Sequence, residues 1–168
     1  CGLNRAGISL DGLETVHDKF RGKKGAFKET TEGIRNALKH DMRVSLRITL
    51  TKHNIGDLPA LVDLAEDLGV QRFCMYHLAY AGRGAKLLSF DLEADERRKA
   101  VEFMFKRTQE SFRNGSDLEV LTVDNHTDAA YLLKWGQENA PDLLENMHRL
   151  LRRNGGNSAG SGIACIDN

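Results

Sequence analysis

Apolar and polar positions along this chain follow a repeating order: a short apolar run, a few polar residues, then an amphipathic stretch. Residues 5–10 and 72–78 are two of the apolar runs, and Asp11 with Gly12 ends the first of them. Between them, residues 44–51 alternate apolar and polar side chains with the two-residue period of a strand. We therefore predict three strands, each of which ends in polar residues.

Amphipathic stretches follow the strands. Residues 30–40 and 57–68 each place apolar side chains on one face, which predicts two helices; Asn54 or Asp57 would cap the second, and Gly69 would end it. The alternation predicts an α/β fold with a parallel sheet. Because β/α barrels build their active sites at the carboxyl ends of their strands, the polar strand ends indicate part of an enzyme barrel.

Two other parts of the chain depart from this order. The segment 13–25 is polar and irregular, so no helix is predicted there. Beyond the third strand, the pattern predicts a long helix, a fourth strand and two more helices, at residues 93–113, 118–123, 129–137 and 141–153.

The chain divides into three parts on this interpretation. Residues 1–114 are the last three β/α units of a barrel, residues 115–153 are a connector, and residues 154–168 begin a further domain. The chain starts at Cys1 without an initiator Met, and its last residues read as a strand running into a turn. We expect the whole protein to be longer, with this chain cut at both ends.

The composition argues against several classes of function. The 24 basic and 24 acidic side chains cancel, and no basic stripe of the kind that binds nucleic acid is present. No apolar run approaches the roughly 20 residues of a membrane span. The three cysteines lie far apart without a Cys-x-x-Cys pair, so a reducing, cytoplasmic setting is expected.

Polar residues at the first two strand ends are candidates for a site. Ser9 and Asp11 occupy alternate positions and are expected to share a face, although Asp-Gly after a strand is also a common turn. Arg47 lies on the polar face of the second strand. If that face points into a barrel, the guanidinium requires an anion from the protein or from a ligand; a solvent-exposed sheet face is an equally good interpretation.

Further candidates follow the first and third strands. Tyr76 and His77 stand at the end of the third strand. Arg83 lies between two glycines, where it would bind a carboxylate or phosphate unless it forms a surface turn. His17 and Arg21 are four residues apart in the polar segment, for which a solvated, charged loop is the simplest interpretation.

The motifs around these residues are similar to those of a known family. Residues 7–12 read Gly-Ile-Ser-Leu-Asp-Gly, residues 16–22 read Val-His-Asp-Lys-Phe-Arg-Gly, and residues 76–84 read Tyr-His-Leu-Ala-Tyr-Ala-Gly-Arg-Gly. Together with the Thr-Lys-His-Asn of residues 51–54, they resemble radical SAM enzymes that carry a C-terminal auxiliary-cluster domain. The resemblance covers nearly the whole chain, and it is greatest to the enzymes of haem d1 synthesis and to related haem-pathway decarboxylases.

The resemblance implies a partial barrel of six β/α units, of which this chain carries the last three strands and lacks the N-terminal half. Such enzymes bind a 4Fe–4S cluster through a Cys-x-x-x-Cys-x-x-Cys loop, and they cleave S-adenosylmethionine to a 5′-deoxyadenosyl radical. This chain lacks that loop. The cluster ligands would therefore lie outside it, within roughly one hundred residues upstream, and the fragment alone would be inactive. A tetrapyrrole substrate and an electron-donor protein are the implied partners.

The resemblance also assigns residues. Ser9 and Asp11 would lie by the ribose and carboxylate of the cofactor, and Arg47 by a carboxylate of the cofactor or the substrate. The backbone of Leu78, Ala79 and Tyr80 would border the adenine. The substrate would be faced by His17, Arg21, Tyr76 and Arg83.

The segment that would begin the auxiliary domain departs from the family pattern. Many relatives have Cys-x-Ala-Gly where residues 157–160 of this chain read Asn-Ser-Ala-Gly. Cys165 is then the candidate ligand of an auxiliary cluster, although one cysteine cannot hold an iron–sulfur cluster by itself.

Other functions remain open. Within the same superfamily, the alternatives are a propionate or acetate decarboxylase of haem synthesis and a peptide-modifying maturase. A phosphate-binding β/α-barrel aldolase would need glycines before a helix N-terminus, for which only residues 82–84 qualify and are followed by a poor helix start. A non-enzymatic, tetrapyrrole-binding fragment would use the histidines near strand ends, His53, His77 and His126.

Overall fold

The computed structural model describes residues 2, 4–123, 125 and 127–153. The chain forms two compact units, Cys1–Asp124 and Asn125–Asn168, and each is described by itself. The predicted division into barrel units, connector and further domain stays a prediction.

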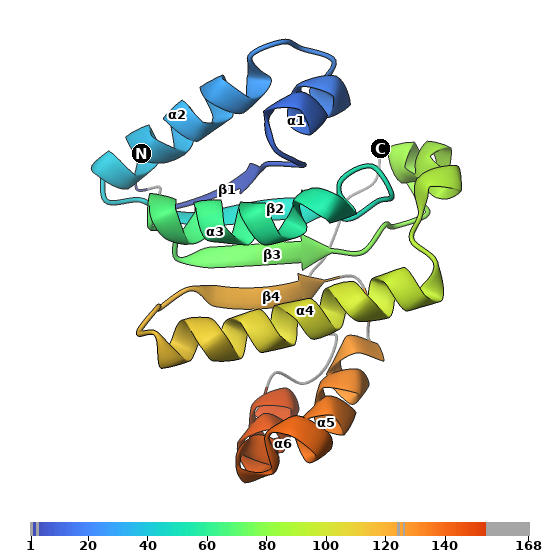
Figure 1. Ribbon diagram of the computed structural model, residues 1–168. Helices are drawn as coiled ribbons and strands as arrows, with labels where there is room; N and C mark the ends of the chain where they lie inside the picture. The colour runs from blue at the N-terminus through green and yellow to red at the C-terminus, as the bar shows by residue number, and fades with distance from the viewer. Residues whose placement is uncertain (1, 3, 124, 126, 154–168) are drawn as a thin grey trace. The chain divides into compact units, whose positions relative to one another are not determined.

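Four parallel strands form one sheet in the first unit, in the order β1-β2-β3-β4 (Figure 1). Their bounds are Arg5–Ser9, Arg43–Thr49, Arg72–Tyr76 and Glu119–Val123. All four predicted strands are present, and the first three end one or two residues earlier than expected, because residues 10, 50–51 and 77–78 belong to the loops that follow. The predicted α/β fold with a parallel sheet is confirmed.

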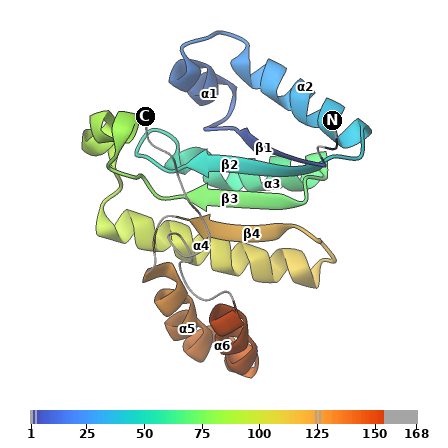
Figure 2. The same ribbon diagram turned by 180° about the vertical axis from the view of Figure 1, so that it is seen from behind.

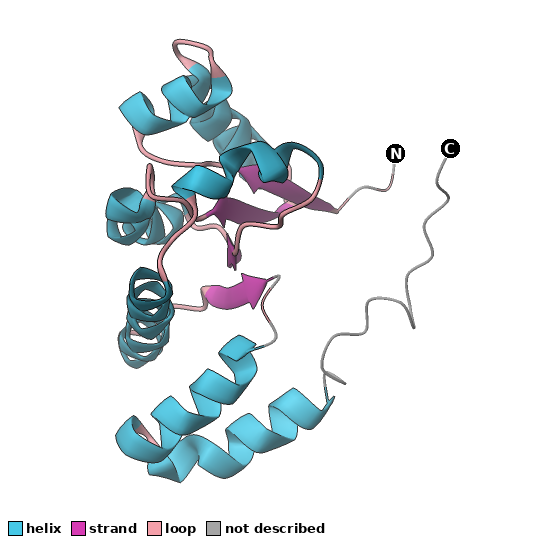
Figure 3. Ribbon diagram, turned by 90° about the vertical axis from the view of Figure 1, so that its right-hand side faces the viewer, coloured by secondary structure: helices cyan, strands magenta, loops and turns pink. Residues whose placement is uncertain are grey.

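The two faces of this sheet differ in polarity. Figures 2 and 3 show α3 (Leu58–Leu68) and α4 (Ala94–Arg113) on the same side of the sheet. The apolar face that packs under the helices is buried, and it includes Val44, Leu46, Ile48, Phe73 and Met75. The opposite face carries polar residues that are exposed or half-buried along β1 and β2. Burial of the apolar face drives this arrangement, since each buried aliphatic side chain contributes about 1.5–3 kcal/mol.

The prediction that residues 13–25 are irregular is wrong in part, because Glu14–Arg21 forms a helix, α1. Its face toward the protein buries His17 in place of an apolar side chain, so the pattern of apolar residues gave no sign of it. Gly22 ends the helix with a φ of 64°, a left-handed conformation that glycine adopts without strain.

The next helix, α2 (Ala26–Lys39), begins earlier than predicted. The carboxylate of Asp18 accepts hydrogen bonds from the backbone N–H groups of Gly25 (2.5 Å) and Phe27 (2.8 Å). These bonds satisfy donors that the first turn of a helix leaves unpaired, and they lower the pKa of Asp18. The residue that pairs these donors therefore lies on α1, seven residues before Gly25. The usual capping pattern involves residues next to the helix start, so it does not reveal Asp18.

The later helices agree with the pattern. Gly69 ends α3 with a φ of 72°, as predicted. The carboxylate of Glu93 and that of Glu96 form a capping box at the start of α4. Two 3₁₀ segments were not predicted: η1 at Ile55–Asp57, and η2 at Gly82–Phe90, where a glycine loop was expected.

The second unit is a helical hairpin. It contains α5 (Thr127–Asn139), the short η3 (Pro141–Leu143) and α6 (Leu144–Arg153), which confirms the two predicted helices. Gly136 lets α6 approach α5, because a Cβ there would lie 2.7 Å from the sulfur of Met147. Among the described residues, no helix has the length and apolar character needed to cross a membrane.

Candidate functional site

The carboxyl ends of β1, β2 and β3 meet at one edge of the sheet. Ser9 pairs in register with Arg47, and Thr49 pairs with Tyr76. Because register partners on neighbouring parallel strands point to the same face, these four side chains share the polar face. Leu78 follows Tyr76 by two residues and is half-buried just beyond β3. The structure therefore brings predicted residues of all three strands to one edge.

Arg47 is the cation on this polar face. Its side chain is exposed and folds over β1, where a Cβ built on Gly7 would lie 2.4 Å from the guanidinium carbon. Within the part of the chain that the structure describes, no carboxylate pairs with this guanidinium. Both conditions suit an anionic ligand: no carboxylate of the described residues competes for the guanidinium, and Gly7 leaves it room.

The alternation predicted that Asp11 shares a face with Ser9, and the structure does not confirm this. β1 ends at Ser9, and Asp11 lies in the loop that follows, with only 4% of its surface exposed. Its carboxylate accepts a hydrogen bond from the Arg21 guanidinium at 2.6 Å. Burial raises the pKa of Asp11, and the positive charge of Arg21 opposes that rise. The charge of Asp11 is thus already compensated inside the protein.

His17 and Arg21 were interpreted as parts of a solvated loop, which is wrong. Both lie on α1; His17 is 1% exposed, and Arg21 pairs with Asp11. With Ser9 and Thr30, they line a pocket of about 590 Å³ beside β1. Helix formation explains the difference, because a spacing of four residues places both side chains on the same helix face.

Asn54 is the residue that sequence reasoning missed. It is fully buried, and its side-chain amide donates hydrogen bonds to the backbone carbonyls of Asp11 (3.0 Å) and Thr49 (2.9 Å). Its carbonyl oxygen accepts the backbone N–H of Thr51 at 2.8 Å. The side chain therefore joins the segments that follow β1 and β2.

Asn54 and Asp57 occupy the N-cap positions of η1 and α3, as predicted. Neither side chain makes a capping bond to η1 or α3. The carboxylate of Asp57 instead accepts the backbone N–H of Leu13 at 2.8 Å, which again joins the β1 and β2 ends. Cross-strand bonds of this kind have no local pattern, so the only sequence signal is a polar residue shortly after a strand.

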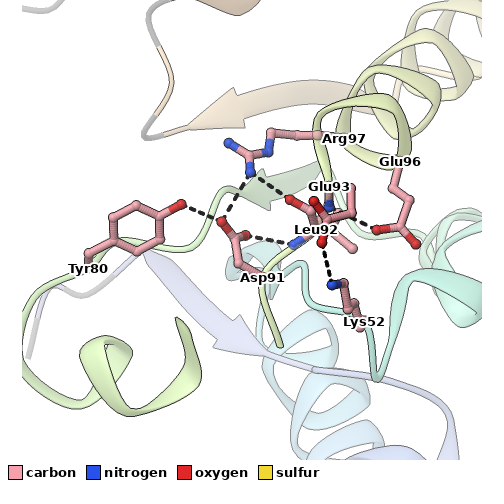
Figure 4. Close-up of polar contacts among 7 residues, drawn as sticks. All are labelled: Lys52, Tyr80, Asp91, Leu92, Glu93, Glu96 and Arg97. Atoms are coloured by element: carbon pink, nitrogen blue, oxygen red, sulfur yellow. Dashed lines mark hydrogen bonds and ion pairs between the residues drawn. The ribbon is translucent and has the colours of Figure 1, made fainter. Parts of the chain in front are cut away.

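The loops after β2 and β3 are tied to the start of α4 (Figure 4). Asp91 accepts hydrogen bonds from the Tyr80 hydroxyl and from the Arg97 guanidinium. Lys52, in the loop after β2, pairs with Glu93 at 2.7 Å. The hydrogen bond to Asp91 raises the pKa of Tyr80. Tyr80, predicted for its backbone, thus also anchors its loop through its hydroxyl.

Other predicted residues lie in the segment after β3 or outside the described residues. Arg83 lies within η2, and Cys165 lies outside the described residues. Of the three histidines, His53 stacks on Phe90 with ring centroids 4.2 Å apart, His77 is buried, and His126 lies outside the described residues.

Two observations bear on metal chemistry. The described residues contain no group of three or more His, Cys, Asp or Glu side chains that would hold a metal ion. Cys74 is buried on β3, and burial raises the pKa of its thiol, which keeps it from acting as a thiolate. Cys74 is therefore a core residue and not a candidate ligand.

No family model matches the chain. Two curated relatives match almost all of it. Fe-coproporphyrin III synthase of Methanosarcina barkeri is 45% identical over 98% of this chain and 41% of its own length. Pre-heme d1 synthase of Dinoroseobacter shibae is 38% identical over 99% of this chain and 42% of its own length. The chain thus spans about two fifths of the length of these relatives.

A solved structure supports the fold independently. Streptococcus suis SuiB bound to S-adenosylmethionine superimposes with a TM-score of 0.60, at 16% identity, over 76% of this chain and 29% of that chain. This likeness is consistent with part of a TIM-like barrel. The chain is a homologue of radical SAM enzymes, which confirms the resemblance predicted from its motifs.

Proposed function

We propose that this chain is part of a radical S-adenosylmethionine enzyme that modifies a side chain of a tetrapyrrole. The observation that carries the proposal is its identity, over nearly its whole length, to two enzymes whose names specify a coproporphyrin and a haem d1 precursor. The polar strand ends supply the second support, since they lie where β/α barrels bind their ligands.

The polar face suits the cofactor of such an enzyme. Arg47 offers an unpaired guanidinium for a carboxylate, and Ser9 is its exposed register partner. The backbone of residues 78–80 would border the adenine. Asp11 would support the backbone beside Ser9 without contacting the cofactor, because its carboxylate is paired with Arg21. When bound to a reduced 4Fe–4S cluster, S-adenosylmethionine supplies the 5′-deoxyadenosyl radical that removes hydrogen from a substrate.

The proposal has parts outside the described residues. The 4Fe–4S cluster would be held by cysteines outside this chain, and an electron-donor protein would reduce it. An auxiliary iron–sulfur cluster would use Cys165 together with ligands from elsewhere. Arg21, Tyr76 and Arg83 would face the acidic side chains of the tetrapyrrole, in a cytoplasmic enzyme.

The proposal is tested on the protein that contains this chain, with its cluster reconstituted. We expect that S-adenosylmethionine, a reductant and a sirohaem derivative yield 5′-deoxyadenosine and a porphyrin of changed mass. Loss of carbon dioxide would indicate a decarboxylase, and replacement of propionates by oxo groups would indicate haem d1 chemistry. 5′-Deoxyadenosine with every tetrapyrrole unchanged would contradict the substrate class, and a precursor peptide would be tested next.

A substitution at Gly7 tests the place of Arg47 without removing its charge. In Gly7→Ala, the new Cβ would displace the guanidinium, which is the far end of a flexible side chain and can move. We expect S-adenosylmethionine to bind several-fold more weakly, while stability stays the same or rises by up to about 1 kcal/mol. Binding is measured by isothermal titration.

Gly33→Ala is the matched control for this substitution. Gly33 lies exposed on α2 with nothing within 4 Å of a Cβ, so its substitution should leave binding unchanged. Equal affinities of Gly7→Ala and the wild type would contradict the placement of the ligand beside Arg47.

A further inference from the structure

Asp11 is held at three different atoms by three side chains. Its carboxylate accepts a hydrogen bond from Arg21 at 2.6 Å, and its carbonyl oxygen accepts one from Asn54 at 3.0 Å. Its backbone N–H donates to Nδ1 of His17 at 3.0 Å. Every polar group of this buried residue is thus paired by a side chain from another segment. The backbone two residues beyond Ser9 is therefore fixed by three side-chain contacts.

The bond to His17 defines the protonation state of that histidine. Nδ1 accepts the Asp11 N–H, so it must carry a lone pair, and the ring proton of a neutral imidazole then lies on Nε2. Nε2 lies 3.4 Å from the hydroxyl of Thr30, and the ring of Phe27 packs edge-on at 6.4 Å between centroids. An imidazolium carries a proton on both nitrogens. Protonation would therefore replace this hydrogen bond by two opposed N–H groups.

We propose that neutral His17 is a positioning residue for the carboxyl end of β1. It holds the backbone of Asp11, and through it Ser9, in the conformation in which the polar face binds S-adenosylmethionine. The role rests on the proposed function, and it replaces the predicted contact of His17 with the substrate. His17 forms part of the wall of the pocket beside β1, but at 1% exposure it offers a ligand almost no surface.

Burial and the charges around His17 set the pH at which it becomes protonated and stops accepting the Asp11 N–H. Burial lowers its pKa, and Arg21 adds to that effect; Asp11 and Asp18 oppose it. α2 contributes the uncharged Thr30 and Phe27. Because the folded pKa lies below the unfolded value of about 6.5, the unfolded chain binds the proton first. Stabilisation by neutral His17 is present above about pH 6.5 and is lost as the pH falls toward the lowered pKa.

The test compares wild type with His17→Gln and His17→Leu in the protein that contains this chain. The dissociation constant of S-adenosylmethionine is measured from about pH 8 downward, through the lowered pH at which the His17 imidazole of the folded protein titrates. Glutamine can accept the Asp11 N–H through its amide oxygen and does not titrate. Leucine cannot accept it, and it leaves a buried N–H unpaired.

We expect three different profiles. Wild-type affinity falls with acidification, in step with the His17 titration followed by imidazole nitrogen NMR. His17→Gln matches wild type at about pH 8 and loses less affinity in acid. His17→Leu binds about tenfold more weakly at both ends, the equivalent of one unpaired buried donor. The amino group of the cofactor titrates equally in all three proteins and cancels in the comparison.

Two further measurements keep the outcomes separate. Hydrogen exchange at the Asp11 amide, measured without cofactor, should be faster in His17→Leu than in His17→Gln. His40→Gln changes an exposed histidine after α2 and should behave as wild type. If His17→Leu does not fold, the comparison of wild type with His17→Gln decides.

The failures are distinguishable. No binding of S-adenosylmethionine by wild type at any pH would overturn the proposed function, and this role with it. Binding by wild type with a pH profile identical to that of His17→Gln would overturn the role of His17 alone.

Discussion

Asn54→Ala is expected to destabilise the protein by about 3–5 kcal/mol. The substitution removes the partner of the buried Asp11 carbonyl, of the part-buried Thr49 carbonyl and of the buried Thr51 N–H. Each buried backbone group left unpaired costs about 1–3 kcal/mol. The loss should appear as a lower midpoint of denaturant unfolding with an unchanged slope.

Asn36→Ala is the control for this change. Asn36 is exposed on α2, so its substitution is expected to alter stability by no more than about 0.5 kcal/mol. If Asn54→Ala unfolded at the same denaturant concentration as Asn36→Ala, the ends of β1 and β2 would not depend on this side chain. The account of how the polar edge is held would then be wrong.

Arg47→Met is expected to weaken S-adenosylmethionine binding by about 10- to 100-fold. A charge-assisted hydrogen bond contributes about 1.5–3 kcal/mol, and each 1.4 kcal/mol is a factor of ten. The guanidinium is exposed and unpaired within the described residues, so stability should change by no more than about 0.5 kcal/mol. Isothermal titration and denaturant unfolding separate the two effects.

Arg43→Met provides a matched comparison for this variant. Arg43 is also exposed on β2, and it lies four residues earlier on the same face, at the amino end of the strand. A ligand at the carboxyl ends of the strands should not reach Arg43, so Arg43→Met should bind S-adenosylmethionine as tightly as wild type. A loss of affinity shared equally by both variants would indicate a general charge effect and would contradict a specific contact to Arg47.

The strands and their faces could be predicted from sequence because a strand with one buried face alternates apolar and polar residues. In β2, Val44, Leu46 and Ile48 are buried while Arg43 and Arg47 are exposed, which is the alternation read from the sequence. Parallel pairing predicted that the polar ends of the strands meet at one edge, and the structure adds the register that places Ser9 beside Arg47. The polar edge was thus predictable from the two-residue alternation of the strands together with the parallel α/β fold class.

The network below that edge was not predictable in the same way. α1 was missed because its buried position is a histidine, and Asn54 was predicted only as a helix cap because such residues cap helices more often than they join loops. Asp11 was predicted to share a face with Ser9, but β1 ends at Ser9 and Asp11 is buried. In each case a polar side chain is satisfied by a partner distant in sequence, and hydrogen bonds of that kind have no period.

The most direct test is a crystal structure of the protein that contains this chain in complex with S-adenosylmethionine. We predict that the nucleotide lies on the polar face at the strand ends, with its carboxylate bound by Arg47 and its adenine beside residues 78–80. A nucleotide bound elsewhere, with Arg47 paired to a carboxylate of the protein itself, would contradict the central claim.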